Sequence, residues 1–487
     1  LHPRVRRQRQ MCIRDRAGKT SDRFSTARTN QTFCSSICRS SRVLYLMNAF
    51  DFAEQILSIP LITDSATLKK AQQGIMDYFA ASLQARNHKK LQDFKAWINQ
   101  EGGNPQAWLI GQKQKATARQ AALFNGFQAH LLDYDDVHSD VRGHPSAVIL
   151  SALFASLSSE KSSLVNSQRF LTAYIIGVEV MARLGKAVNP AHYLKGWHST
   201  ATLGGIAATC AICYLHKKDF LAQAIALAAT QASGMRMVFG SPIKALHAGM
   251  AAQSAIQAVE WIEAGLSLEQ NAFDENIGFF ALFTEKRSPQ ALLEKWGENW
   301  QIDQLWFKTY PYCSAAVGIA DSSYQLREEL DDPNEIEKIE LFFHPNADAA
   351  LIYRRVQKPS EGRFSAEYLV AAILFGKTLD FQHFEQAECE PDICKLMTKI
   401  DRLYQATPEN KRAVTIVMRL KNGAVLQAQS DYPKGSPMKP YSDEELNQKL
   451  AQAINNEAIY RDFSQALSAL LEGVEMNAFI QTYQSIL

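Results

Sequence analysis

The chain has 487 residues, which is too long for one hydrophobic core, so two domains are expected. Hydrophobic residues make up 46% of it and charged residues 21%, as in ordinary globular proteins. Residues 1–46 carry eleven Lys and Arg against two Asp, which leaves 41 basic and 48 acidic residues in the rest of the chain. This mildly acidic body argues against nucleic acid as the main partner.

Residues 1–46 are rich in Arg, Ser and Thr and show no apolar periodicity. We interpret them as a non-native or disordered N-terminal extension before a start at Met47, although a transit peptide would have a similar composition. We expect neither a secretory signal nor a membrane partner. The run from Trp197 to Leu215 is long enough to span a bilayer, but its many Ala, Gly, Ser and Thr residues indicate a closely packed interior helix.

From Ala49 to about Trp300, apolar residues recur at spacings of three and four, which predicts helices. The segment Gly102-Gly103-Asn104-Pro105 interrupts this pattern. Many interior positions are Ala or Gly, so the helices can approach one another closely. After the interruption, the predicted helices span residues 117–132, 145–157, 168–184, 199–214, 219–233 and 243–264.

The pattern changes after about Trp306. IEKIELFFHP predicts a strand, and AVTIVMRLKNGAVLQAQS predicts a β-hairpin whose Asn422-Gly423 pair fits a type I′ turn. A helix in RFSAEYLVAAILFGK lies between them, and the chain becomes helical again after residue 432. We therefore expect a mainly α protein. Residues 47–303 and 432–487 would form a large all-helical domain, and residues 304–431 a smaller α/β domain inserted before the C-terminal helices.

Five of the eight cysteines lie beyond residue 46, at positions 210, 213, 313, 389 and 394. This odd, scattered set predicts reduced thiols and a cytoplasmic protein. Cys210 and Cys213 form a C-x-x-C pair inside ATCAICYL, which is typical of a buried helix rather than of a redox or metal site.

The segment HLLDYDDVHSDVRGHPS, residues 130–146, has the densest group of titratable side chains. It holds three His, four Asp and one Arg. A solvated acidic loop is one interpretation, but three of the chain's eleven histidines favour a pocket. His144-Pro145 opens a predicted helix. Because Pro is favoured at the first helical position and a helix N-terminus attracts anions, we expect His144 at an anion-binding corner.

Other helix starts repeat this arrangement. His198 precedes a helix of small residues, and Pro242 starts the helix that bears Lys244 and His247, three residues apart and so on one face. Each alone could be a cap or a surface side chain, but together they predict a cationic site for an anion. Lys308, in WFKTYPYCS, lies near the predicted domain junction, where ligand sites are common. A surface lysine beside an aromatic residue is the alternative.

These segments resemble, in order, the successive motifs of the MmgE/PrpD family. The motifs are LLDYDDVH…GHPS, GWHSTATLGG, GSPIKALHAGMAAQSA, FKTYPYCSAA, GRFSAEYLVAAIL and YPKGSP…SDEELNQKL. The resemblance covers roughly Ala49 to the C-terminus. The family includes 2-methylcitrate dehydratase, cis-aconitate decarboxylase and iminodisuccinate epimerase.

The resemblance implies a large all-helical domain, a smaller α/β lid, a homodimer, and a reaction that needs no metal ion and no other cofactor. We expect a lyase that dehydrates or decarboxylates a small di- or tricarboxylate. A dicarboxylate epimerase and a non-catalytic helical binding protein that retains the fold are the alternatives. Carried onto this sequence, the expected catalytic residues are Asp133, His144, His198, Lys244 and Lys308. The expected substrate-binding residues are His138, Arg142, His247 and Cys313.

Two positions depart from the family pattern. Val137 stands where a threonine hydroxyl is expected, and Cys313 stands where cis-aconitate decarboxylases carry a histidine. Both changes argue against simply transferring a relative's substrate.

Two metal-dependent classes of enzyme are further alternatives for the His- and Asp-rich segment. An HD-type phosphohydrolase needs a His-Asp dipeptide, which the chain lacks. An isoprenoid synthase would match Asp135-Asp136 but needs a second acidic cluster, and basic residues stand there instead.

Overall fold

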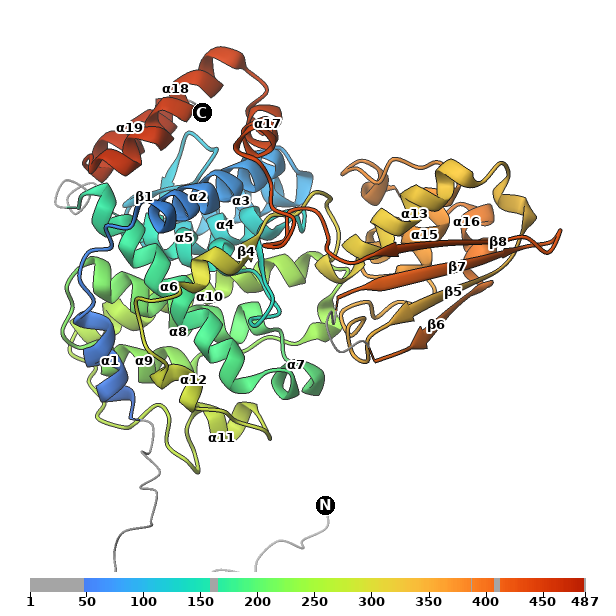
Figure 1. Cartoon of the computed structure of the whole chain (residues 1–487). Coiled ribbons are helices and arrows are strands. Elements are labelled where there is room, and N and C mark those ends of the chain that lie inside the picture. The colour runs from blue at the N-terminus through green and yellow to red at the C-terminus, as the bar shows by residue number, and fades with distance from the viewer. Residues whose placement is uncertain (1–47, 158–164, 387, 407–411, 486–487) are drawn as a thin grey trace, which may run out of the picture. The chain divides into compact units, whose positions relative to one another are not determined.

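The structure, a computed structural model, describes residues 48–157, 165–386, 388–406 and 412–485. The extension predicted for residues 1–46 lies outside them. The described chain is mainly α, as predicted, and helices make up most of it outside one four-stranded sheet (Figure 1). The helices before residue 300 are α1 (Ala49–Leu57), α2 (Ser65–Ala85), α3 (Lys89–Glu101), α4 (Ala118–His130), α5 (Pro145–Ser156), α6 (Ser167–Val188), α7 (Ala191–Lys195), α8 (Ser199–Leu215), α9 (Leu221–Thr230), α10 (Pro242–Glu263), α11 (Phe279–Phe283) and α12 (Gln290–Leu293).

Many helices begin at a side chain that accepts a hydrogen bond from the first turn, which otherwise leaves its N–H groups unpaired. Asp64 caps α2, Asn166 caps α6 and Ser241 caps α10. Thr117 caps α4 in a reciprocal capping box with Gln120. These local signals explain why the helix starts predicted from the sequence fall within a few residues of the observed ones.

Glycines let α4 and α10 touch along their backbones. A Cβ on Gly126 would lie 2.6 Å from the Cα of Gly249, and a Cβ on Gly249 would lie 2.1 Å from the carbonyl oxygen of Leu123. Neither position therefore tolerates a side chain without moving a helix. One turn after Gly126, this close packing brings His130 beside Lys244 near the start of α10.

Buried apolar residues form two clusters. The first is built by the helices before residue 300 together with the C-terminal helices α17 (Asp443–Ile454), α18 (Glu457–Ala469) and α19 (Met476–Ser485). The second lies mainly between residues 312 and 428. The predicted domain boundaries at residues 303/304 and 431/432 stay a prediction.

A four-stranded sheet has the order β6-β5-β7-β8. β5 pairs in parallel with β6 and antiparallel with β7, which pairs antiparallel with β8. Helices pack on one face of the sheet (Figure 1). The elements of this part are α13 (Val317–Glu329), β5 (Ile336–Phe343), α14 (Pro359–Gly362), α15 (Ala366–Leu374), α16 (Pro391–Met397), β6 (Ile400–Tyr404), β7 (Val414–Leu420) and β8 (Val425–Ser430).

The predicted strand and hairpin are confirmed as β5 and as β7–β8, but the type I′ turn is wrong. A type I′ turn needs a positive φ at both central residues, whereas Gly423 has φ +88° and Asn422 is not left-handed. Gly423 N donates to Leu420 O, and Leu420 N donates to Ala424 O across a three-residue loop. The side chain of Asn422 accepts a hydrogen bond from Ala424 N, which stabilises this alternative loop.

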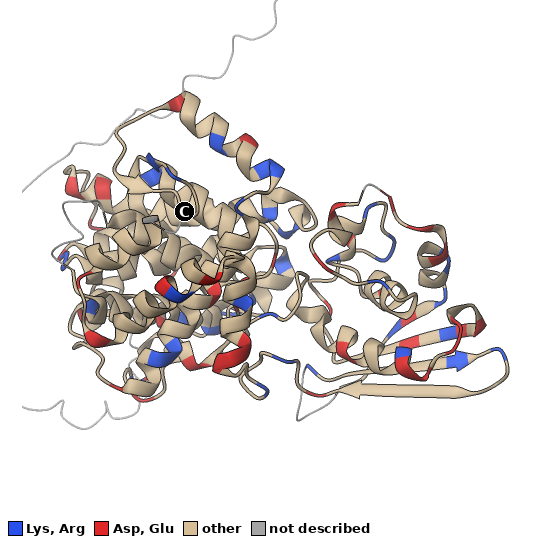
Figure 2. Cartoon of the chain, turned by 90° about the horizontal axis from the view of Figure 1, so that it is seen from above, with Lys and Arg blue, Asp and Glu red and all other residues tan. Residues whose placement is uncertain are grey.

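Charged residues of both signs occur on the sheet, although not on every strand (Figure 2). Lys338 on β5 lies 3.2 Å from Asp401 on β6, and Arg419 on β7 lies 3.9 Å from Glu340 on β5. The opposite charges within such cross-strand pairs cancel locally, so they do not form a continuous basic surface of the kind that binds nucleic acid. In the described residues, no helix is both long enough and apolar enough to cross a membrane.

The cysteine prediction needs one correction. Cys210, Cys213 and Cys313 are free and buried, and the C-x-x-C pair lies inside α8 as expected. Cys389 and Cys394, however, are joined by a disulfide just before and within α16, so the expectation that all five thiols are reduced is wrong. The sequence offered no signal for this pairing, because a spacing of five residues matches no common cysteine motif.

Candidate active site

The segment between α4 and α5 carries most of the candidate residues. Asp133 follows α4 in a left-handed conformation, with φ +53°. The chain then forms β3 (Val137–His138), which pairs antiparallel with β4 (Leu305–Trp306). This pairing places residue 308, two positions after β4, beside the turn at Asp133, although the two segments are far apart in the sequence.

Asp133 lies between two lysines. Lys244 Nζ donates to Asp133 Oδ1 at 2.9 Å, and Lys308 Nζ donates to the same oxygen at 2.6 Å and to the Asp133 carbonyl at 2.7 Å. Burial would raise the pKa of Asp133, but Lys244 and Lys308 outweigh it and hold that pKa well below its usual range. Burial also lowers the pKa of Lys244, and Asp133 partly opposes this effect. The carboxylate is thus ionised, and its other oxygen, Oδ2, is buried without a hydrogen-bond partner.

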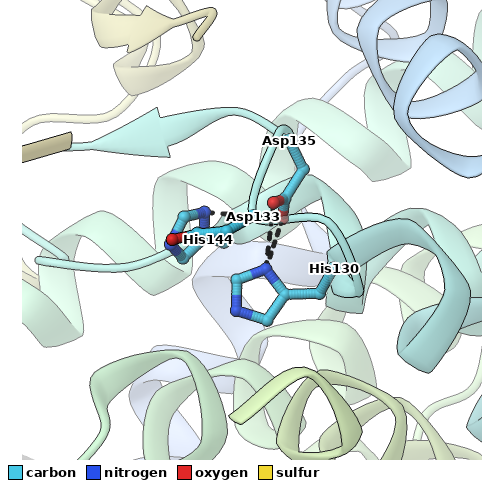
Figure 3. Close-up of side chains that lie close together, drawn as sticks. All are labelled: His130, Asp133, Asp135 and His144. Carbon is cyan, nitrogen blue, oxygen red and sulfur yellow. Dashed lines mark hydrogen bonds and ion pairs between the residues drawn. The ribbon is translucent and has the colours of Figure 1, made fainter. Parts of the chain in front are cut away.

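His130 contacts both Lys244 and a second carboxylate, that of Asp135, and the pair of His130 and Asp135 is drawn in Figure 3. Its Nδ1 lies 2.9 Å from both oxygens of Asp135, so the carboxylate accepts from Nδ1–H. Its Nε2 then accepts from Lys244 Nζ at 2.9 Å. Burial lowers the pKa of His130 despite the neighbouring Asp135. A continuous chain of hydrogen bonds therefore runs from Asp135 through His130 and Lys244 to Asp133.

His144 is the N-cap of α5, with Pro145 at the first helical position, as predicted. Its Nδ1 donates to the carbonyl of Asp136 at 2.8 Å, which leaves Nε2 with a lone pair, 3.6 Å from Asp133 Oδ1. Burial lowers its pKa well below the usual range, and the nearby His130, Lys244 and Lys308 lower it further. A neutral imidazole with a free basic nitrogen is suited to accept a proton from a ligand.

His198 caps α8, again as predicted, and its Nδ1 lies 3.1 Å from His247 Nδ1. Burial lowers the pKa of His198 well below its usual range and lowers that of His247 to about 4. Since both rings are neutral, one nitrogen can donate to the other. His198 lines the same cavity as His144 and Lys244. His247 lines a separate, smaller cavity and contacts His198 through the hydrogen bond between their Nδ1 atoms.

Of the three remaining predicted substrate-binding residues, two line the main cavity and one does not. Arg142 and Cys313 line the main cavity, as does Val137. His138 lies in β3 and is fully buried, its Nδ1 accepts from Asp140 N, and it is not among the residues that line the cavity. The structure therefore places His138 in a supporting position and not in contact with a ligand. Burial lowers its pKa to about 4.

Two neighbours of the site were not among the predicted residues. His130 contacts Lys244 directly, and Arg363 is buried with its Nη2 3.7 Å from Glu385. His130 stands in ALFNGFQAHLLD, and its apolar surroundings could have indicated a buried, paired histidine. Arg363 stands in GRFSAEYLVAAIL, one of the motifs that carry the family resemblance, but nothing in its immediate neighbours indicated that it would lie close to the site.

The main cavity has a volume of about 570 Å³, within the range of small-molecule sites. Four cationic side chains line it, Arg142, Lys186, Lys244 and Arg412, against the carboxylates of Asp133 and Asp140. With neutral histidines, the wall carries a net positive charge. The cavity is therefore suited to a small anion with more than one negative charge.

Four residues in the site could by their chemistry hold a metal ion. One ligand atom from each of His130, Asp133, Asp135 and His144 lies within 4.8 Å of the others (Figure 3). However, Lys244 and Lys308 already donate to Asp133, and Lys244 also occupies His130 Nε2. Unit charges of like sign about 4 Å apart repel by about 4 kcal/mol near a protein surface, and a divalent ion would double this. The two ammonium groups beside these four residues therefore favour the binding of an anion over that of a metal cation.

Two family models and several curated proteins match this chain. The family model described as MmgE/PrpD N-terminal domain matches residues 51–292, and the MmgE/PrpD C-terminal domain model matches residues 310–459. A cis-aconitate decarboxylase-like protein of Aspergillus oryzae, oryM, is 25% identical over 393 residues, 74% of this chain and 81% of the relative. The cis-aconitate decarboxylase of Homo sapiens is 27% identical over 352 residues, 68% and 71% of the two chains, and that of Mus musculus is 27% identical over 380 residues, 73% and 75%.

Proposed function

Since this chain belongs to the MmgE/PrpD family, we propose that it is a metal-independent lyase that acts on a small di- or tricarboxylate in the main cavity. The observation that carries the proposal is that Asp133 and Lys244 line a cavity of net positive charge, and that Lys244 and Lys308 share Asp133 Oδ1 as a hydrogen-bond acceptor. Relatives named as cis-aconitate decarboxylases support a lyase as the general kind of enzyme.

Lys244, which lines the cavity, would bind a substrate carboxylate and stabilise the negative charge that develops during the reaction. Lys308 is not among the residues that line the cavity and would act through Asp133, to which it donates. Both side chains are nearly fully buried, so little water competes for their protons. Asp133 accepts hydrogen bonds from both ammonium groups and holds them at one point. A carboxylate that enters the cavity would therefore accept a hydrogen bond from a Lys244 whose position is already fixed.

His144 and Lys244 are the groups we assign to proton transfer. A dehydration requires a base for the proton beside a carboxylate and an acid for the departing hydroxyl. A decarboxylation requires a donor that protonates the carbanion left when carbon dioxide departs. The basic Nε2 of His144 can accept the proton that a dehydration removes. Lys244, with its lowered pKa, can act as the acid that donates a proton in either reaction. His198 lies beside them on the same cavity wall and would orient the substrate.

Cys313 and Val137 bear on which substrate is used. Both line the cavity, and neither supplies the polar group that the family pattern places there. We therefore keep epimerisation of a dicarboxylate as the second candidate reaction, since it needs the same base and acid but no leaving group. A homodimer, a cytoplasmic location and the use of the α/β part as a lid over the helical part are further parts of this proposal.

The test is direct turnover of a panel of di- and tricarboxylates that includes cis-aconitate and 2-methylcitrate. Proton NMR of the mixture distinguishes loss of water, loss of carbon dioxide and exchange of an α-proton in deuterated water. We expect at least one compound to be converted by either elimination or decarboxylation. Proton exchange alone would favour the epimerase, and no reaction with any member would favour a non-catalytic binding protein.

A further inference from the structure

Arg142 is a cation in the cavity wall for which the described part of the chain supplies no counter-ion. Among the described residues, no oxygen accepts a hydrogen bond from its guanidinium, and no carboxylate lies within ion-pair distance of it. Its guanidinium stacks over the ring of Tyr193, 5.5 Å from the centroid. Arg236 contacts the same ring at 4.1 Å but donates to the carbonyl of Ala349, so its charge has a partner.

The backbone holds Arg142 in place. Asn189 donates to the carbonyls of Asp140 and Val141, and a Cβ on Gly185 of α6 would lie 2.6 Å from the oxygen of Asp140. Arg142 itself has φ +55°, a conformation that only a firmly supported non-glycine residue keeps. The side chain is thus directed by a rigid loop rather than by a flexible one.

The two acidic groups in the wall already have partners, since Asp133 pairs with Lys244 and Lys308. Asp140 also lines the cavity, but its carboxylate lies 4.0 Å from Lys186 Nζ. Arg412 adds a further cation to the wall, where it donates to Ser139 and packs over Trp306. The charge of Arg142 is therefore left for a ligand, and this side of the cavity would favour an anion of its own.

Cys313 and Val137 line the same cavity as Lys244 and Arg142. The cavity wall therefore combines these weakly polar and apolar side chains with two cationic groups that come from different segments, α10 and the loop after β3. Such a lining suits a carbon chain that carries more than one negative charge.

We propose that Arg142 is a specificity-determining residue that binds a second, remote carboxylate of the ligand, so that the cavity selects acids with two separated negative charges. The proposal rests on the proposed function only in that it concerns the same cavity. A guanidinium can bind a carboxylate through two parallel hydrogen bonds, which gives both affinity and direction.

The test uses binding, which needs no turnover. Linear saturated dicarboxylates from succinate to pimelate, and the monoamide of each, are titrated into the full-length wild-type protein by isothermal calorimetry. Arg142→Gln removes the charge and keeps a Cβ, so the backbone strain at this position is unchanged. Arg142→Lys keeps the charge, and Arg419→Gln, on an exposed position of β7, is the matched control.

We expect the wild type to bind one diacid at least about tenfold more tightly than its monoamide, as charged hydrogen bonds commonly provide. Arg142→Gln should abolish that preference, Arg142→Lys should keep most of it, and Arg419→Gln should keep all of it. An unchanged preference in Arg142→Gln, or no preference in the wild type, overturns the proposal. If the wild type converts no polycarboxylate while Arg142→Gln still loses the preference, only the proposed reaction fails.

Discussion

Lys308 Nζ lies 2.6 Å from Asp133 Oδ1, although 175 residues separate the two in the chain. The short β3–β4 pairing brings their segments together, and Lys244 completes the contact from α10. Three charges from three separate segments thus meet at one oxygen. The site exists only when the helices and the segment around β4 are both in place.

Replacing Lys244 or His144 by alanine should each lower kcat by roughly a hundredfold or more. Loss of a positioned acid or base, or of a charge-stabilising donor, commonly has this effect. The measurement is the initial rate with the substrate found in the turnover panel. Lys89→Ala, in an exposed pair with Asp93, is the control and should keep the wild-type rate. Wild-type turnover in both active-site variants would rule out the assigned roles.

The pH dependence of kcat/KM should follow the lowered pKa values. Burial and neighbouring cations lower the pKa of His144 well below 6.5, so its basic form is complete at neutral pH, and activity is lost only as pH falls through that lowered value. Burial also lowers the pKa of Lys244 below 10.5, so its acidic form, and with it the activity, is lost on the alkaline side before that pH.

A profile of kcat/KM from pH 4 to 11 measures both limbs. An acid limb with its midpoint near the ordinary histidine value, about 6.5, would contradict the role of a buried, neutral His144. In Lys244→Arg, any remaining activity should persist to higher pH, because a guanidinium stays protonated there.

Asp133→Asn should lower the free energy of unfolding by about 3–5 kcal/mol, since it leaves two buried ammonium groups without their counter-ion. Lys308→Met in the same background should recover part of the loss, because it removes one of the uncompensated charges. Urea unfolding of the two single variants and the double variant forms a cycle that measures the coupling. Strictly additive effects would mean that the two side chains do not interact in solution.

Local signals explain how much of the site could be predicted. The helix expected at residues 243–264 is observed as Pro242–Glu263, because a serine cap, a proline at the first turn and an apolar period all lie within it. The same logic predicted His144 and His198 at helix starts, and both are N-caps that line one cavity. Where a residue's position depends on its immediate neighbours, the sequence was sufficient.

Tertiary contacts explain what could not be predicted. The pairing of His130 with Lys244 depends on the glycine contact between α4 and α10, which no local pattern reveals. His138 stood in the same cluster as His144, yet the alternation of β3 turns it away from the cavity. Lys449 is a further case, since SDEELNQKL resembles a solvent-exposed helix.

Removal of divalent metal ions should leave turnover unchanged. Lys244 and Lys308 already neutralise Asp133, so the carboxylate has no need of a metal ion. The measurement is the rate before and after dialysis against EDTA, with metal content determined by mass spectrometry. Loss of activity that returns on adding one metal would show that the group of His130, Asp133, Asp135 and His144 serves as a metal site.

Lys449→Ala should both destabilise the protein and lower kcat. Lys449 on α17 is buried, and its Nζ donates to Asp77 Oδ1 at 2.7 Å, to Tyr134 O at 2.8 Å and to Lys308 O at 3.1 Å. The side chain therefore ties α17 to α2 and to the backbone on both sides of the Asp133–Lys308 contact. Its removal leaves a buried carboxylate and two buried carbonyls without a donor, and breaking such a pair costs about 3–5 kcal/mol.

Because Lys449 is a positioning residue, kcat should fall through the displacement of Lys308, while the pH limbs assigned to His144 and Lys244 keep their midpoints. Lys449→Arg, which retains a donor, should recover part of both losses. Gln448→Ala, at the exposed neighbouring position, is the control. If Lys449→Ala is less stable but keeps the wild-type kcat at a temperature where it is folded, then Lys449 stabilises the packing of α17 without positioning Lys308, and the positioning role is wrong.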